Sequence, residues 1–470
     1  MKYEVFFPHH KIMIGLLLMA GLSSSCKRLI EIPPNPATAV TEAQQFSDSA
    51  TAMTAVAGCF SYQSNGGGSF TFNDGNLARN TGMSSDELIY TYTGDPAGLQ
   101  FYANNLNAFN GSVSGMWASP YIGLYPVNAT INGIAASSGL SASFKKATIA
   151  ELKVVRALYY FYMINIFGGV PYVSSTDYQA TSRLARSPVD TVYARILSDL
   201  TDAQQALPEE YPSEGRFLPN RNVASAFLSK VYLYRQEWQK AYDAANTVIS
   251  SGEYILEPDL NNVFLEGSQE AIWQLPATGS YSVTSEAQSF VPQSSGTVPT
   301  YIFTSLLKDA FESGDQRLDK WAMATTVNIG GVDQVFYSPY KYKNVYPGAT
   351  VEDYMIFRLG EVYLIRAEAA AHLGNTGEAL DDLNQVRLRA GVSASTASTE
   401  DDLLAAIMHE RQTELFTEWG SRWLDLKRTG TIDAVLGAEK PGWDAHDALY
   451  PIPNAQLNLN GLLKQNPGYQ

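Results

Sequence analysis

The clearest pattern of apolar and polar positions lies between residues 352 and 391 and predicts two helices joined by a tight turn. Apolar or small residues recur there at helical spacing, at Met355, Leu359, Val362, Ala370, Leu373, Ala379, Leu380, Leu383 and Val386. Gly374 is placed to end the first helix, and Gly391 to end the second. Asn375 and Glu378 have the spacing of a capping box for the second helix. A hairpin that is apolar on both helices needs neighbours to bury those faces.

A second hairpin of the same type is predicted over residues 222–252. Its apolar and small positions are Leu228, Ser229, Tyr232, Trp238, Ala241 and Ala245. This spacing resembles the tetratricopeptide pattern of two helices per repeat, in which each repeat stacks on the next. An ordinary antiparallel helix pair would give a similar pattern. The two hairpins are therefore similar in type but do not share a repeated sequence motif.

Four further segments have helical character. Residues 148–167 begin with Thr148 and Glu151 at capping-box spacing and contain four consecutive aromatic residues, Tyr159–Tyr162, which predicts a helix buried on most sides. Residues 188–207 and 399–419 follow, the latter with Thr399 and Asp402 as its capping pair. Residues 117–136 are predicted to be helical with an interruption at Pro126. The chain is therefore expected to be mostly α, with its helical scaffold at about 148–252 and 352–430.

Helical periodicity fails in two long stretches, about 61–116 and 253–351. Both are rich in Ser, Thr, Gly, Tyr and Pro, with one short strand expected at residues 270–275. Stretches of this length within a compact protein are usually functional. We therefore expect them to carry the ligand site.

The N-terminus has the pattern of a secretion signal that is removed. Lys2 and Lys11 precede the apolar run 12–22, which is too short to span a bilayer and is followed by Ser23–Ser25 and Cys26. Small residues before a cysteine resemble a bacterial lipoprotein cleavage site, although Leu22 lies four residues before the cysteine. We expect residues 1–25 to be a signal peptide and Cys26 to carry lipid. Ordinary secretion with a free Cys26 is the alternative.

Composition narrows the classes of function. The chain of 470 residues carries a formal charge of -15, which disfavours nucleic acid and anionic membrane surfaces as partners. With only Cys26 and Cys59, a lipidated Cys26 leaves no disulfide within the chain. No other segment is apolar enough to cross a membrane, so lipid would be the sole anchor.

Signs of catalysis are weak, and neither a metal nor a cofactor is expected. His372, His409 and His446 lack metal-ligand spacing, and the pattern from His409 has Thr413 where a zincin would place its second histidine. Asp86 and Glu87 could suggest a glycosidase, but neighbours on a strand face opposite ways. The charged residues between 410 and 428 include Glu418 and Arg422 at i,i+4 spacing, and we interpret them as an ion-pair network that stabilises the last hairpin.

Aromatic residues outside the helices are the best candidates for a binding surface. The chain has 28 tyrosines, 20 phenylalanines and 7 tryptophans, and aromatic faces suit the C–H faces of sugar rings. For any single ring, a place in the core remains the simpler explanation. The predicted ligand-binding residues are Asp86, Tyr90, Tyr92, Tyr102, Tyr281, Tyr301 and Trp321. We expect at least two of Tyr90, Tyr92, Tyr281, Tyr301 and Trp321 to be exposed on one concave surface.

Several stretches together resemble the SusD/RagB family of outer-membrane nutrient-binding lipoproteins of Bacteroidetes. Besides Cys26 after a signal, they are AELKVVRALYYFYMINIFGGVPYV at 150–173, FRLGEVYLIRAEA at 357–369, LNQVRLRAGV at 383–392, ERQTELFTEWGSRWLDLKRTG at 410–430, YPIPNAQLNLN at 450–460 and QNPGY at 465–469. The resemblance covers essentially the whole chain after residue 25, and implies a single SusD-like domain at 26–470.

What the resemblance implies goes beyond the residue patterns. It implies about four tetratricopeptide-like helix pairs, with ligand contacts from loops near residues 85–87 and from the stretch between the second and third pairs. It also implies a non-enzymatic oligosaccharide-binding protein at the outer membrane, facing outward, with a SusC-like TonB-dependent transporter as partner. A glycoside hydrolase on a helical scaffold, a structural lid without a ligand, and a protein that binds peptides or other nutrients remain alternatives.

Overall fold

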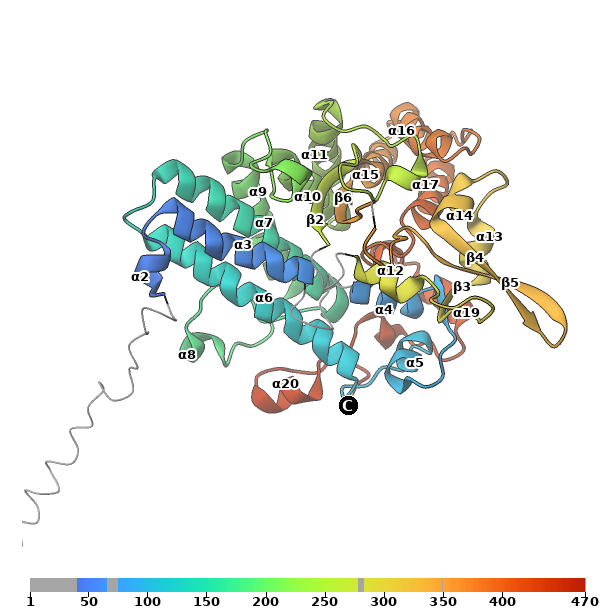
Figure 1. Cartoon of the computed structure of the whole chain (residues 1–470), viewed down its shortest axis with the longest axis horizontal. Helices are drawn as coiled ribbons and strands as arrows, with labels where there is room; N and C mark the ends of the chain where they lie inside the picture. The colour runs from blue at the N-terminus through green and yellow to red at the C-terminus, as the bar shows by residue number, and fades with distance from the viewer. Residues whose placement is uncertain (1–39, 66–74, 278–282, 349, 470) are drawn as a thin grey trace, which may run out of the picture.

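The computed structural model describes residues 40–65, 75–277, 283–348 and 350–469 (Figure 1). The α-helices there are α2 Glu42–Gln45, α3 Ser49–Asn65, α4 Leu77–Ser84, α5 Pro96–Tyr102, α6 Gly111–Ala136, α7 Ala142–Phe167, α8 Tyr178–Thr181, α9 Val189–Ala206, α10 Arg221–Tyr234, α11 Trp238–Ser250, α12 Ser285–Phe290, α13 Ser305–Ala310, α14 Gln316–Trp321, α15 Leu359–His372, α16 Thr376–Arg389, α17 Glu400–Glu414, α18 Ser421–Arg428, α19 Ile432–Glu439 and α20 Asn454–Leu459. Three short 3-10 helices are η3 Glu214–Arg216, η4 Leu260–Asn262 and η5 Ala445–Ala448. The mostly α fold class is confirmed. In this part of the chain, no helix is both long and apolar enough to cross a membrane.

The long helices form a stacked series of hairpins. Helix α7 packs on α9, α10 on α11, and α15 on α16, while α9–α10 and α11–α15 contacts join the hairpins. Figure 1 shows the series running from α3 and α6 on one side to α16 and α17 on the other. The hairpin predicted at 222–252 is present as α10 and α11.

The hairpin at 352–391 is present with two differences. Its first six residues after Glu352 form strand β6, Asp353–Arg358, so Met355 belongs to a strand. Gly374 and Gly391 end their helices with φ of +78° and +79°, as expected for glycine in the left-handed region. The predicted capping box is wrong, because the Asn375 side chain makes no cap hydrogen bond. The Glu378 carboxylate instead accepts a hydrogen bond of 2.7 Å from the Tyr242 hydroxyl of α11, which joins the two hairpins.

The aromatic helix α7 is buried on most sides, as predicted. Tyr159–Tyr162 are at most 4% exposed. The helix begins six residues before the predicted start, with Ser141 as its N-cap, so Thr148 and Glu151 lie inside it. Burial raises the pKa of Glu151 to about 7. The capping box predicted from Thr148 and Glu151 is therefore wrong, because both residues lie within the helix and not at its N-terminus.

Pro126 does not interrupt α6, contrary to the sequence prediction. The helix runs from residue 111 to 136 through Pro120 and Pro126. A proline removes one hydrogen bond to the carbonyl four residues earlier, which for Pro126 is that of Ile122. Because Ile122 is an exposed residue, that carbonyl can bind water instead.

The two irregular stretches hold most of the short elements. The described strands form three antiparallel pairs: β1 Leu88–Tyr90 with β3 Tyr301–Phe303, β2 Ala271–Pro276 with β6, and β4 Ala322–Ile329 with β5 Val332–Pro339. The strand predicted at 270–275 is β2. The β4–β5 hairpin turns at Gly330 and Gly331, both at positive φ, and projects from the body (Figure 1). Short helices α4 and α5 lie in the first stretch, and α12, α13 and α14 lie in the second.

A buried ion network lies where α14, α15, α16 and α17 meet. Glu414 is fully buried and accepts hydrogen bonds from Arg317, Arg358 and Arg389. The network also includes Glu270, Asp315, Lys341, Arg387, Glu410 and Glu418. Burial alone would raise the pKa of Glu414, but Arg389, Arg358 and Arg317 outweigh it and hold that pKa well below its usual range. The predicted structural network is therefore present and is largely buried.

The pairing within the network differs from the prediction in one respect. Glu418 and Arg422, proposed as an i,i+4 pair, do not pair with each other. Glu418 lies in the turn between α17 and α18, where it binds Lys341 and Arg358. Arg422 binds Asp86 instead. The helical spacing rule fails here because the chain leaves the helix after Glu414.

Candidate functional site

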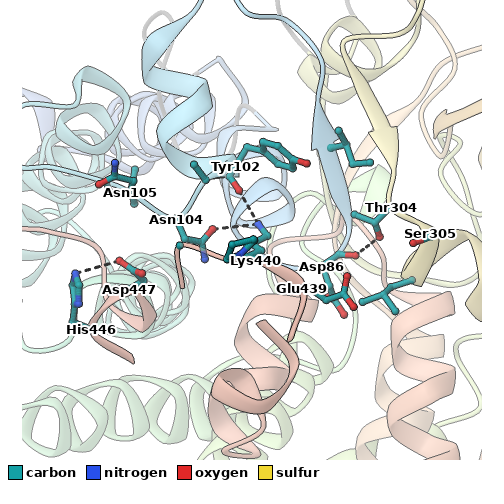
Figure 2. Close-up of a pocket in the computed structure, with 16 residues that line it drawn as sticks. Asp86, Tyr102, Asn104, Asn105, Thr304, Ser305, Glu439, Lys440, His446 and Asp447 are labelled. Carbon is teal, nitrogen blue, oxygen red and sulfur yellow. Dashed lines mark hydrogen bonds and ion pairs between the residues drawn. The ribbon is translucent and has the colours of Figure 1, made fainter. Parts of the chain in front are cut away.

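A cavity of about 670 Å³ lies where segments distant in sequence meet (Figure 2). One wall comes from Asp86 and β1, another from the end of α5 and residues 103–106, and a third from the start of α13. The end of α19 and η5 complete it. The lining residues are Asp86, Ile89, Tyr102, Ala103, Asn104, Asn105, Leu106, Thr304, Ser305, Leu306, Glu439, Lys440, Pro441, Gly442, His446 and Asp447. We refer to this cavity as the α5–α19 pocket.

Asp86 is fixed at the base of one wall. Both of its carboxylate oxygens accept hydrogen bonds from Arg422, at 2.8 Å from Nε and 2.6 Å from Nη2. Its backbone carbonyl accepts a hydrogen bond from the Thr304 hydroxyl, which ties β1 to α13. Bidentate arginine pairs of this kind hold a carboxylate in one geometry. Asp86 therefore shapes the pocket while its charge is already compensated.

Lys440 joins the opposite wall to the turn after α5. Its ammonium group donates hydrogen bonds to the carbonyls of Met83 and Tyr102 and to the side-chain oxygen of Asn104. Asn104 has a φ of +48°, a region that asparagine tolerates better than most residues. Burial lowers the pKa of Lys440 to about 7. The lysine is thus directed at protein acceptors and not at the space of the pocket.

The remaining polar side chains differ in exposure. Asn105 and Glu439 are exposed, and His446 is half-buried between two carboxylates. Its Nδ1 lies 2.6 Å from Asp444, and its Nε2 lies 3.4 Å from Asp447. With Tyr102 half-buried above them, the pocket offers one aromatic ring, amides, hydroxyls and carboxylates (Figure 2). This mixture can form hydrogen bonds to a ligand that carries many hydroxyl groups.

Glu87, next to Asp86, points into the core instead. Its carboxylate accepts a 3.1 Å hydrogen bond from the backbone N–H of Thr417, a residue at φ +51°. Burial raises the pKa of Glu87 to about 8. The two adjacent acids therefore face different surroundings, as expected for neighbours at the start of a strand.

Replacing Glu87 by glutamine should change how stability depends on pH. The folded state binds the Glu87 proton more tightly than the unfolded state, whose pKa is about 4.3. Its contribution to stability is therefore complete below that value and is lost as pH rises through about 8. The glutamine of Glu87→Gln cannot ionise. The unfolding free energy of this variant minus that of wild type should therefore increase by up to about 4 kcal/mol from pH 5 to pH 9.

Urea denaturation of both proteins at the two pH values measures this difference. Other titrating groups, such as Lys341, are common to both proteins and cancel in the comparison. A difference in unfolding free energy that stays constant from pH 5 to pH 9 would contradict a buried, protonated Glu87.

The predicted aromatic residues that the structure describes lie in three places: a cluster at β1 and β3, the α5–α19 pocket, and, for Trp321, the core. Tyr90, Tyr92 and Tyr301 form a cluster, with Tyr90 and Tyr301 rings 5.2 Å apart and Tyr90 and Tyr92 rings 6.5 Å apart. Since Ile89 lines the α5–α19 pocket, the alternation of β1 places Tyr90 on its other face. Tyr102 lines the pocket itself. Tyr281 lies outside the described residues.

Only Tyr92, at 56% exposed, presents a large surface among the described members of this set. Tyr90 and Tyr301 are buried, and the Tyr90 hydroxyl donates to Asp95. The assignment of Trp321 to a binding surface is wrong, because it is fully buried and its indole N–H donates to the Leu260 carbonyl. Its ring lies against Lys341, with Nζ 4.8 Å from the ring centroid, as part of the ion network.

Sequence reasoning named only two of the sixteen lining residues, Asp86 and Tyr102, as ligand-binding. It did not single out Asn104, Asn105, Glu439, Lys440 or Asp447, and it considered His446 only as a metal ligand. In the described chain, no group of three or more histidine, cysteine, aspartate or glutamate residues is placed to hold a metal ion. The turn at Pro441 and Gly442 was the one available signal, but a turn does not show which distant segment it faces.

Two family models match separate parts of the chain, 160 residues each. The model described as the SusD family matches residues 310–469, and the one described as starch-binding associating with outer membrane matches residues 74–233. The chain belongs to the SusD/RagB family. These matches include both Asp86 and Arg422, the pair that joins the two matched regions at the pocket.

Relatives of this SusD/RagB protein agree with that assignment. SusD-like protein P2 of Formosa agariphila is 28% identical over 421 residues, which cover 77% of this chain and 81% of the relative. The starch-binding protein SusD of Bacteroides thetaiotaomicron is 34% identical over 131 residues, or 25% of this chain and 22% of that protein. The family is thus one of carbohydrate-binding proteins associated with the outer membrane.

Solved structures confirm the fold. A SusD superfamily protein from Bacteroides vulgatus superposes with a TM-score of 0.80 at 20% identity, covering 90% of this chain and 100% of that one. A laminarin-binding SusD-like protein gives a TM-score of 0.75 at 24% identity, with 90% and 100% covered. The tetratricopeptide-like helical architecture is shared with these structures.

Proposed function

We propose that this protein is a lipid-anchored, outward-facing receptor of the outer membrane that binds an oligosaccharide in the α5–α19 pocket. It would pass the ligand to a SusC-like TonB-dependent transporter. The observation that carries the proposal is the pocket itself, which places Tyr102, Asn105 and Glu439 around one cavity of about 670 Å³ in a member of a carbohydrate-binding family. A cavity of this size lies within the range of small-ligand sites.

The lining chemistry supports a sugar as the ligand. An exposed carboxylate such as that of Glu439 accepts hydrogen bonds from hydroxyl groups, and the amide of Asn105 both donates and accepts. The Tyr102 ring can pack on the C–H face of a sugar. The fixed groups, Asp86 and Lys440, hold the walls so that these contacts are preorganised.

A binding role fits the pocket better than glycoside hydrolysis. A glycosidase needs one carboxyl group to donate or accept a proton and a second to act as nucleophile or base. Both oxygens of Asp86 are engaged by Arg422, so Asp86 is poorly placed to supply either function. Two of the proteins named above, the starch-binding SusD and the laminarin-binding SusD-like protein, are also described as binding proteins. Incubation of the protein with each bound glycan, followed by chromatography, should show no shortened products.

Replacing Tyr102 by alanine should weaken glycan binding by about 5- to 150-fold. An aromatic ring that becomes covered by a bound sugar contributes on the order of 1–3 kcal/mol through its area and its contacts. Calorimetry on residues 27–470 with laminarin and starch oligosaccharides measures this loss. The matched control is Tyr178→Ala, because Tyr178 is 79% exposed and does not line the α5–α19 pocket. Equal affinities for wild type and Tyr102→Ala would argue against this pocket as the site.

A further inference from the structure

Besides Tyr102, five ionisable side chains line the α5–α19 pocket: Asp86, Glu439, Lys440, His446 and Asp447. Their formal charges differ from the charges that a ligand would meet. The bidentate contact with Arg422 neutralises the negative charge of Asp86, and the same contact neutralises the positive charge of Arg422. The arginine is therefore not free to bind an acidic group of a ligand.

The ammonium group of Lys440 is also already hydrogen-bonded to groups of the protein. Its ammonium group faces two backbone carbonyls and the Asn104 oxygen, and the side chain is only 9% exposed. An ammonium group with three acceptors has used its three donors. A carboxylate or sulfate in the pocket could bind Lys440 only after one of these contacts had broken.

His446 is flanked by two acids whichever proton it carries. Asp444 lies at one ring nitrogen and Asp447 at the other, as Figure 2 shows for Asp447. If the ring is protonated, its charge is matched by these carboxylates. His446 therefore adds no positive charge that a ligand could use.

Glu439 is the exception, because its carboxylate has no hydrogen bond or ion pair with any described part of the chain. It is exposed at the C-terminal end of α19, where the helix dipole also contributes partial negative charge. The chain as a whole carries a formal charge of -15. The free electrostatic character of the pocket is therefore negative.

We infer that the α5–α19 pocket selects neutral oligosaccharides and rejects glycans that carry carboxylate or sulfate groups. The inference rests on the proposed function and specifies its ligand class. A neutral sugar donates hydroxyl hydrogen bonds to Glu439, whereas an anionic sugar meets that carboxylate with no uncommitted cation among the lining residues. At a separation of several ångströms in partly solvated surroundings, such repulsion weakens binding by roughly tenfold.

The test uses matched pairs of glycans and residues 27–470, which include every described residue. Laminarin oligosaccharides and maltooligosaccharides are each compared with the same chains after oxidation of their C6 hydroxyls to carboxylates. Calorimetry should give at least about tenfold weaker binding for the oxidised member of whichever pair binds. Glu439→Gln should reduce that ratio severalfold. Glu210→Gln, at an exposed glutamate outside the pocket, should leave it unchanged.

The outcomes separate the two proposals. Equal or tighter binding of the oxidised glycan contradicts the inference and leaves the proposed function intact. An unchanged ratio in Glu439→Gln contradicts the role of Glu439 and hence the inference. If neither member of any pair binds to wild type, the proposed function fails for these glucans, and the inference fails with it.

Discussion

Glu414→Ala should lower the melting temperature by several degrees or more. Three arginines, Arg317, Arg358 and Arg389, donate to the Glu414 carboxylate, and its side chain is fully buried. Removing one member of a buried ion network leaves charge without compensation, which typically costs about 3–5 kcal/mol. Scanning calorimetry measures the change, and glycan binding by the folded fraction should remain close to wild type, because Glu414 does not line the pocket.

Glu209→Ala is the matched control for this experiment. Glu209 also pairs with an arginine, Arg221, but its side chain is 72% exposed. Exposed pairs contribute about 0–1 kcal/mol, so the control should melt within a degree or two of wild type. A Glu414 variant as stable as this control would mean that the buried network contributes little, and that apolar packing alone holds α14 to α17 together.

Cys26→Ala should release the protein from the membrane fraction completely. The sequence predicts that Cys26 carries lipid, and each buried CH₂ of an acyl chain contributes about 0.8 kcal/mol to membrane binding. A multiply acylated cysteine therefore binds far more tightly than a single chain. Without it, the acidic surface of the protein gives no attraction to anionic lipid. Fractionation of cells that express each protein, followed by immunoblotting, measures the loss.

Cys59→Ala provides the control, because Cys59 is the other cysteine of the chain. It is buried against Thr130, with Sγ 3.6 Å from Oγ1, and burial raises the pKa of its thiol to about 11. An inaccessible, protonated thiol is a poor substrate for acylation. The Cys59 variant should therefore stay with the membrane. Mass spectrometry that finds wild-type Cys26 unmodified would contradict the lipid anchor.

The helical scaffold was predictable because its signals are local. Apolar spacing within 222–252 and 359–389 falls on α10, α11, α15 and α16, and glycines end two of these helices as expected. The local signals failed where a tertiary contact competed with them. Glu378 forms a hydrogen bond with Tyr242 in place of the predicted capping box, and Arg422 pairs with Asp86 in place of Glu418.

The pocket was less predictable because its residues share no local pattern. Asp86 and Tyr102 were identified from the irregular stretch, and both line the cavity. Lys440 and Glu439 come from the end of a short helix whose sequence does not indicate its neighbours. Trp321 was wrongly assigned to the binding surface. A segment that is rich in aromatic residues but lacks periodicity gives no signal that distinguishes an exposed ring from a buried one. Sequence composition alone cannot assign the exposure of such residues.

The contacts that build the pocket also determine when it can form during synthesis. Arg422 reaches back 336 residues to Asp86, and Lys440 reaches back 357 residues to Met83. Closing such long loops slows folding, and the wall residues near 440 are synthesised long after Met83 and Asp86. A nascent chain thus lacks the complete pocket until the segment around Lys440 has been made. If the predicted signal peptide directs export of the unfolded chain, the pocket would form only after the segment around Lys440 has been exported, which is too late to capture a sugar in the cytoplasm.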